Sequence, residues 1–305
     1  MLDGAATKGA RLCPPRTSRS GPETAWAPFG IGAVRLLTSA ATGFAVVLCL
    51  TVTGLAAEKK EEKKPEPPRL LVALPLAVEA GTNTTIRLRG IGLAEAKGVR
   101  IVSTNAAAAA VATNAALSVT LKTKGKAEVP KDYDVKRVGD TQLEVELKLP
   151  ATLAAGPLAL VVINPEGETA PYSLTIVAAG SLVAEKEPNG GFRQAQELSF
   201  GKAIRGGIGE PNDVDVFRFT GQKNERIVAT VTAARQGASL DGILTLYNSA
   251  GQILATSDDS EGVADPLLNA RLPADGTYFL SLIDAHDRGS AMHVYLLSLT
   301  RAEPR

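Results

Sequence analysis

Oxygen-bearing side chains gather in two short stretches in the second half of the chain. The first is Glu185 to Gly190, with the sequence EKEPNG, and the second is Asn212 to Phe219, with the sequence NDVDVFRF. Calcium takes six to eight oxygen ligands from carboxylates, amides, carbonyls and water. If the two stretches lie side by side, they predict a calcium site whose candidate ligands are Glu185, Glu187, Asn189, Asn212, Asp213 and Asp215.

A second interpretation of the same residues remains open. Aspartate and asparagine commonly cap turns through hydrogen bonds to the nearby backbone, and exposed carboxylates are often simply solvated. The residue types alone do not separate a calcium site from a set of turn-capping side chains.

Catalytic chemistry finds little support in the sequence. The histidines are His286 and His293, and both cysteines, Cys13 and Cys49, lie in the first fifty residues. The stretch Asp284 to Asp287 places one histidine between two aspartates, but a Ser-His-Asp site needs three convergent groups and an oxyanion hole. Phosphate-binding glycine loops, HExxH and nucleophile-elbow motifs are absent from the sequence. We therefore predict a protein that is not an enzyme.

Composition limits the partners. The 305 residues suffice for two domains, the formal net charge is only +1, and aromatic residues make up 4% of the chain. A chain with this charge has no strong field for nucleic acid or an anionic membrane, and it has few rings on which bases could stack. We expect no nucleic-acid partner, and membrane contact only through the N-terminal segment.

The first 57 residues predict a leader and signal peptide. Arg35 precedes an almost uncharged run that ends in small residues at Ala56 and Ala57, directly before charged residues. The alternative is an uncleaved anchor, although threonines and glycines dilute the apolar run. The unusually long leader before Arg35 also raises the hypothesis of a later translation start. Residues 58–68, EKKEEKKPEPP, predict a solvated linker.

The remaining chain predicts an all-β protein with two antiparallel β-sandwich domains in tandem, at residues 69–178 and 179–305. Period-two alternation and apolar runs separated by Gly, Pro and Asn turns predict the strands. In the first domain these are residues 70–74, 84–90, 99–102, 141–149, 158–163 and 172–177. In the second they are residues 216–219, 226–231, 242–247, 252–255, 276–282 and 293–299. The alanine-rich residues 105–116 are predicted as a loop or a short helix.

Residues 69–178 resemble an IPT/TIG-type or other immunoglobulin-like domain. The resemblance rests on the strand and glycine-flanked turn at residues 84–93, and on the strand and Asn-Pro-Glu-Gly turn at residues 161–167. It implies a fold and no particular chemistry.

The C-terminal segment resembles a bacterial pre-peptidase C-terminal (PPC) domain more specifically. The matching pieces occur in the family's order, at residues 185–189, 213–217, 244–251, 257–259 and 272–278. The resemblance implies a module of secreted proteins, and in some relatives calcium or an extracellular polymer as ligand. It also places Glu185, Glu187, Asn189, Asn212 and Asp215 at calcium-ligand positions. Gly190 stands where these relatives carry an acidic or amide side chain, and Asn212 stands where an aspartate is common, and both departures should weaken binding.

We therefore expect a secreted, periplasmic or cell-surface accessory module that binds an extracellular polymer or surface protein. The alternative is a structural spacer without a specific ligand. An exposed aromatic cluster, formed for example by Tyr247, Tyr278 and Tyr295, would favour binding, whereas burial of all three would favour the spacer. Burial is the default for Tyr278 and Tyr295, since one face of each strand points to the core.

Overall fold

The computed structural model describes residues 67–102, 117–131, 133–260 and 262–302. The predicted signal peptide, nearly all of the linker and the alanine-rich stretch 105–116 lie outside these residues. Within them the protein is almost entirely β-structure, which confirms the predicted fold class. All of these residues belong to one compact unit of the chain that runs from Glu62 to Arg305.

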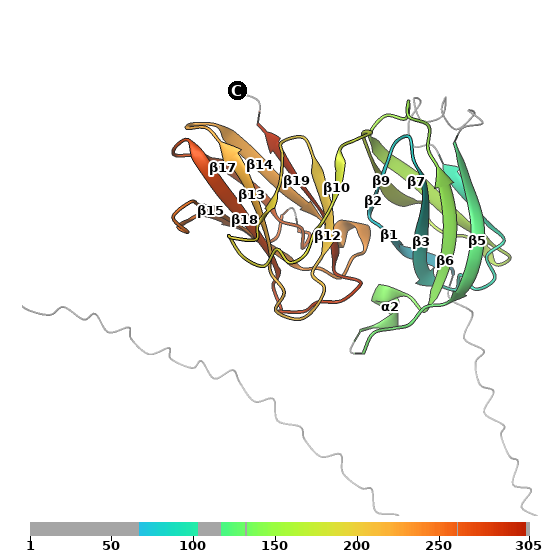
Figure 1. The fold of residues 1–305 in the computed structure, drawn as a ribbon. Coiled ribbons are helices and arrows are strands. Elements are labelled where there is room, and N and C mark those ends of the chain that lie inside the picture. The colour runs from blue at the N-terminus through green and yellow to red at the C-terminus, as the bar shows by residue number, and fades with distance from the viewer. Residues whose placement is uncertain (1–66, 103–116, 132, 261, 303–305) are drawn as a thin grey trace, which may run out of the picture. The chain divides into compact units, whose positions relative to one another are not determined.

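The first sandwich consists of two sheets (Figure 1). One sheet has the order β1-β3-β6-β5 and the other β2-β9-β7-β4, with β8 paired to β7. The bounds are β1 Arg69–Leu74, β2 Ala77–Glu79, β3 Asn83–Ile91, β4 Gly98–Val102, β5 Ser118–Lys126, β6 Thr141–Lys148, β7 Gly156–Asn164, β8 Gly167–Glu168 and β9 Tyr172–Val177. A four-residue helix, α2 (Val135–Val138), precedes β6, and the Asp134 side chain caps it by accepting from the Lys136 backbone N–H.

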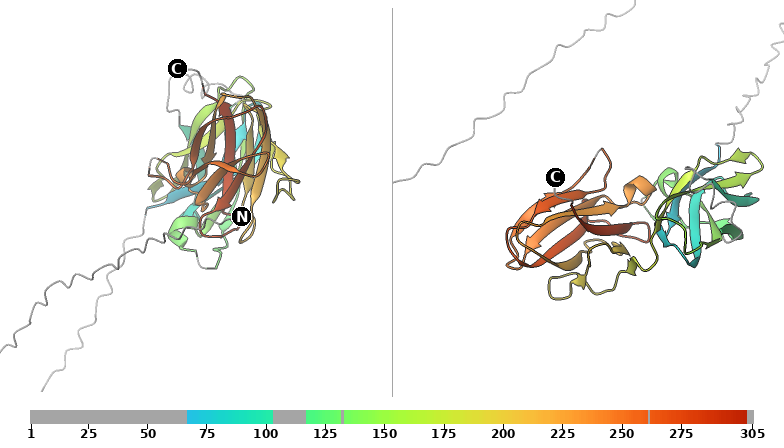
Figure 2. Two further views of the ribbon diagram at one scale, coloured as in Figure 1. Left: turned by 90° about the vertical axis from the view of Figure 1, so that its left-hand side faces the viewer. Right: turned by 90° about the horizontal axis from the view of Figure 1, so that it is seen from above.

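The second sandwich also has two sheets, ordered β10-β12-β19-β14-β17 and β11-β13-β18-β15-β16. The bounds are β10 Leu182–Ala184, β11 Gln196–Glu197, β12 Ala203–Gly207, β13 Asp215–Gly221, β14 Arg226–Thr232, β15 Gly242–Asn248, β16 Ile253–Ser257, β17 Leu267–Arg271, β18 Gly276–Asp284 and β19 Val294–Arg301. A short 3-10 helix spans Ala234–Gln236. The rotated views show these strands as packed layers (Figure 2).

Alternating side chains build the two cores. In β6, Leu143, Val145 and Leu147 are buried while the residues between them are more exposed, as the period-two pattern predicts. In the second sandwich, β13 contributes Phe217 and β18 contributes Leu280 to a core that also includes residues of β14 and β19. Burying each large apolar side chain contributes about 1.5–3 kcal/mol to folding.

The structure adds details that the alternation pattern did not reveal. Three short edge pairs are parallel, namely β2 with β9, β10 with β12 and β11 with β13, so the sandwiches are not purely antiparallel. The sequence prediction also omitted β2, β5, β8, β10, β11, β12 and β17. Four of these seven strands, β2, β8, β10 and β11, have only two or three residues, which is too short to display a period.

Tyr278 shows how a polar ring is accommodated in the second core. Its ring is buried, and its hydroxyl donates to the Ala274 carbonyl at 2.6 Å. This hydrogen bond closes the turn that leads into β18, in the manner of a tyrosine corner. A hairpin turn at residues 248–251 joins β15 to β16, and Asn248 N–H donates to the Gln252 carbonyl at 3.0 Å across it.

Candidate metal centre

The candidate site lies where the segment after β10 passes beside the start of β13. Glu185 N–H donates to the Arg205 carbonyl of β12 at 3.0 Å, which fixes the beginning of the segment. Farther along, the Asn189 carbonyl accepts from the Val216 N–H of β13 at 3.1 Å. These two backbone bonds place the segment next to Asp215, the first residue of β13.

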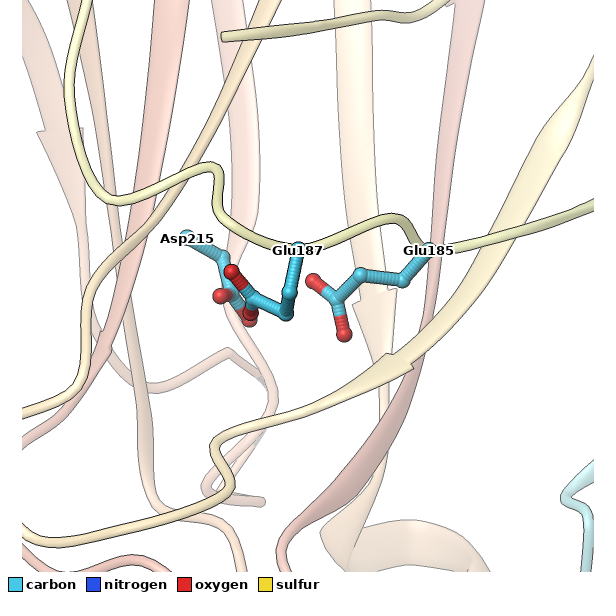
Figure 3. A group of neighbouring side chains, drawn as sticks. All are labelled: Glu185, Glu187 and Asp215. Atoms are coloured by element: carbon cyan, nitrogen blue, oxygen red, sulfur yellow. The ribbon is translucent and has the colours of Figure 1, made fainter. Parts of the chain in front are cut away.

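Three carboxyl groups converge there. Glu185, Glu187 and Asp215 each offer an oxygen atom, and these atoms all lie within 4.8 Å of one another (Figure 3). Asp215 is fully buried, Glu185 is partly buried and Glu187 is exposed. The group therefore has a buried end and an end open to water, which leaves room for water ligands on a cation.

Tyr295 joins Glu185 to Asp215 inside the protein. Its hydroxyl lies 2.5 Å from Glu185 Oε1 and 2.6 Å from Asp215 Oδ2. A phenol has a single hydrogen, so it can donate to only one of these two oxygens. The other carboxyl oxygen then faces a lone pair of the phenol oxygen at hydrogen-bond distance. A shared proton or a bound cation would remove the repulsion between these two oxygens.

Glu185, Glu187, Asp215 and Tyr295 form an acidic corner. Ionising all of these groups costs free energy, because the corner is partly buried and the charges have the same sign. Burial, followed by the negative charge of Glu185, raises the pKa of Asp215 to about 9. Burial, with the charges of Asp215 and Glu185, also raises the pKa of Tyr295 well above its ordinary value. Both directions mean that further negative charge is disfavoured here unless a positive charge is supplied.

Two buried oxygen atoms at this corner have no hydrogen-bond partner. Among the described residues, such atoms are Glu79 Oε1, Asn164 Oδ1, Asn189 Oδ1, Asp215 Oδ1 and Gln236 Oε1. The Asn189 amide nitrogen donates to Glu185 Oε1 at 3.0 Å, so the amide is held against the carboxylates. A buried oxygen without a partner costs about 1–3 kcal/mol, and a bound cation would remove that cost.

The structure distributes the six predicted ligands unequally. It brings Glu185, Glu187 and Asp215 together, with Asn189 hydrogen-bonded to Glu185. Asp213 Oδ2 instead accepts from the Gly209 N–H at 2.8 Å. As metal ligands, all six remain predictions.

Asn212 and Glu187 also take part in local structure. Asn212 is exposed and has a φ of 65°, a backbone conformation that asparagine tolerates better than most residues. Glu187 Oε2 accepts from the Asn189 N–H at 2.8 Å. Glu187 and Asp213 therefore do accept hydrogen bonds from the nearby backbone, as the turn-capping interpretation predicts. This hydrogen bond does not prevent Glu187 from also contacting a cation.

Tyr295 and Gly206 are the participants that sequence reasoning missed. Tyr295 lies 110 residues after Glu185, and its strand pattern predicts only burial. Gly206 is in β12, where an added Cβ would lie 2.5 Å from Glu185 Oε2 and 2.6 Å from the Tyr295 ring. The signal available for Gly206 was a pair of glycines, with Gly207, at the end of an otherwise ordinary strand.

A second acidic group consists of Asp241, Asp258 and Asp259, whose oxygen atoms also lie within 4.8 Å of one another. Asp258 and Asp259 are exposed, as expected for a solvated turn. None of the buried, unpartnered oxygens of the described residues belongs to this group. Its geometry gives no reason beyond charge to hold an ion.

The two histidines are placed differently. His286 is exposed, and its Nδ1 lies 3.4 Å from Asp241 Oδ2. His293 is fully buried, and its Nδ1 lies 2.9 Å from Ser290 Oγ. The Ser290 hydroxyl also accepts from the Met292 N–H, so this serine shapes the turn before β19.

We expect His293 to make folding sensitive to acid. Burial lowers the pKa of His293, with Arg288 acting in the same direction and Asp284 opposing it; the Tyr133 hydroxyl lies 3.2 Å from Nε2. Above about pH 6.5 the side chain is neutral in both states, and below it the unfolded chain takes up a proton more readily. The free energy of unfolding should therefore fall as the pH drops.

Urea unfolding at pH 7.5 and pH 5 would measure this effect. A His293→Asn variant should be less stable than the unsubstituted protein at pH 7.5, and the gap should narrow at pH 5. A gap that stays constant or widens would contradict the assignment.

Comparison with known proteins identifies the class of the second sandwich. Residues 213–283 match the family of the bacterial pre-peptidase C-terminal domain. The chain thus contains a PPC domain, as the resemblance predicted. The immunoglobulin-like or IPT/TIG resemblance of residues 69–178, and the domain boundaries as a whole, remain predictions.

Each of the similar proteins matches only part of this chain, and the chain spans only a small part of the protease that it resembles. A probable subtilase-type serine protease of Deinococcus radiodurans is 42% identical over 99 residues, which cover 32% of this chain and 14% of that protein. The solved pre-peptidase C-terminal domain of a Bacillus anthracis collagenase is similar with 15% identity and a TM-score of 0.30, covering 38% of this chain and all of that one. The periplasmic lysozyme inhibitor PliG of Aeromonas hydrophila shows 11% identity and a TM-score of 0.29, over 40% of this chain and 98% of that one. In the described part of the chain, no helix has the length and apolar character needed to cross a membrane.

Proposed function

We propose that the protein is an exported, non-catalytic accessory module that binds an extracellular polymer or a surface protein. The observation that supports this most directly is the PPC domain, an accessory domain without catalytic residues of its own. The related subtilase-type protease supports an extracellular setting, although the shared segment is a small part of that protein.

Calcium is the cofactor that the acidic corner would suit. Its candidate ligands are hard oxygens from Glu185, Glu187, Asp215 and Asn189, with no nitrogen or sulfur ligand among them, and such sets favour calcium or magnesium over transition metals. The ion would join the segment after β10 to the start of β13, and its role would be to stabilise the domain.

A structural spacer without a ligand is the second candidate. Tyr278 and Tyr295 are buried, so they contribute nothing to a binding surface, and this favours the spacer. Tyr247 is only partly buried and contacts the exposed Phe192, which favours binding. The exposed aromatic cluster is therefore composed differently from the three tyrosines considered from the sequence.

A pull-down of the purified protein against insoluble polymers and cell-envelope fractions tests the choice. We expect enrichment on at least one fraction with calcium present, and less enrichment with a chelator if the ion holds the domain in shape. Equal recovery on all fractions and on a bare resin, with and without calcium, would leave the spacer as the function.

A further inference from the structure

An aromatic platform lies on the outer face of the sheet β11-β13-β18-β15-β16. The Phe192 ring stacks on Phe279 with centroids 4.5 Å apart and planes 16° apart, and it meets Tyr247 edge-on at 5.2 Å. Tyr247 of β15 and Phe279 of β18 are directly paired in register. Their sequence neighbours Leu246 and Tyr278 are buried, so the paired rings occupy the face that points away from the core.

Phe192 is unusual for a residue of its type because 38% of its surface is exposed. It lies outside the strands, in the segment between Asn189 and β11, so the interior of the sandwich does not require it. A large ring held flat against a second ring, with its outer side in water, offers an apolar surface for stacking.

A shallow hollow of about 580 Å³ adjoins this platform. Phe192 and Phe279 contribute to its apolar lining together with Leu198, Phe200 and Phe219. Thr220 and Thr277 add hydroxyl groups. The hollow is open and lies on the face of the sheet, so it suits a chain that passes across it better than a ligand that must be enclosed.

The charges in the hollow balance. Glu197 and Arg218 also line it, and they are paired in register on β11 and β13. Both are exposed, and neither side chain has a hydrogen bond or ion pair with another described residue. Arg301, the other cation at the hollow, already pairs with Glu225 and stacks over Phe200 at 3.8 Å. The free groups thus supply both donors and acceptors, without a net charge that would select a polyanion or a polycation.

We propose that this face binds a neutral polysaccharide, with one sugar ring stacked on Phe192 and its hydroxyl groups bonded to Arg218 and Glu197. A sugar ring presents an apolar face of C–H groups and a rim of hydroxyls that both donate and accept, which matches a ring platform flanked by a guanidinium and a carboxylate. A polypeptide that adds to a sheet uses the backbone groups of an edge strand, whereas these side chains lie on the face. The proposal rests on the proposed function and narrows its partner.

Affinity electrophoresis and isothermal titration with soluble neutral polysaccharides (β-glucan, xylan and glucomannan), with alginate and heparin as charged probes, test the proposal. We expect binding to at least one neutral polysaccharide and none to the charged ones. Phe192→Ala should weaken that binding about tenfold, which corresponds to about 1.4 kcal/mol. Arg218→Ala should weaken it as well.

Leu267→Ala is the matched control, because Leu267 is a large, 43% exposed apolar residue on β17 of the opposite sheet. It should bind like the unsubstituted protein. Binding to charged polysaccharides alone, or binding that Phe192→Ala leaves unchanged, would overturn the proposal. If no polysaccharide binds but an envelope protein is enriched in the pull-down, this inference fails and the proposed function stands. If neither the polysaccharide assays nor the pull-down shows binding, both this inference and the proposed function fail.

Discussion

Millimolar calcium should raise the midpoint of thermal unfolding of this protein relative to a chelator. A ligand that binds only the folded state at one hundred times its dissociation constant adds about 2.7 kcal/mol, or about 5–10 °C for a chain of this size. The gain is expected because the ion would satisfy the buried oxygens of Asn189 and Asp215 and offset the repulsion between Glu185 and Asp215. Differential scanning calorimetry with calcium and with a chelator measures it, and equal midpoints at millimolar calcium would contradict it.

The effect of an Asp215→Asn substitution on stability should change sign between chelator and calcium. Asparagine keeps the shape of the side chain but cannot ionise, so the variant avoids the cost of burial and of the Glu185 charge that raises the pKa of Asp215 to about 9. In chelator the variant should match or exceed the unsubstituted protein, whereas with calcium it should be less stable and show little response. Asp275→Asn is the control, since Asp275 caps a remote turn by accepting from the Lys223 N–H. If Asp275→Asn lost the calcium response to the same extent, charge in general and not this site would be responsible.

The strands that could be predicted from the sequence are those in which alternating polar and apolar residues determine which face is buried. Residues 141–149 alternate strictly, and β6 places Leu143, Val145 and Leu147 in the core. By contrast, β5 is mostly exposed, and its sequence SVTLKTKGK has no sustained apolar face to mark it as a strand. Its position is set by pairing with β6, a long-range contact that a local pattern does not contain.

The candidate site likewise contains residues that the sequence predicts and residues that only the packing of distant strands brings together. Glu185 and Glu187 were recognisable because two carboxylates at positions i and i+2 share one side of an extended segment. The fully buried position of Asp215 and the hydroxyl of Tyr295 between two carboxyl groups depend on how β13 and β19 pack. Spacing along the chain could not separate Asp213, which holds the Gly209 N–H, from Asp215, which faces the other carboxylates.

Replacing Gly206 by alanine should displace the Glu185 or Tyr295 side chain of the acidic corner. The added Cβ would lie 2.5 Å from Glu185 Oε2 and 2.6 Å from the Tyr295 ring, distances that force one of these side chains to move. Overpacking of this kind costs about 1–3 kcal/mol. Because Glu185 and Tyr295 are held together by a hydrogen bond, moving either one should also weaken the calcium response. Calorimetry with and without calcium measures both effects.

The neighbouring glycine provides a matched control for that change. A Cβ on Gly207 would meet its nearest atom, the His293 carbonyl oxygen, at 3.4 Å, and the Gly207 N–H that donates to Glu185 Oε2 is retained in alanine. Gly207→Ala should therefore keep most of the stability and the full calcium response. Equal losses in the two variants would show that β12 tolerates no side chain at its end. A Gly206→Ala variant with an unchanged calcium response would show that Glu185 and Tyr295 do not position the ion.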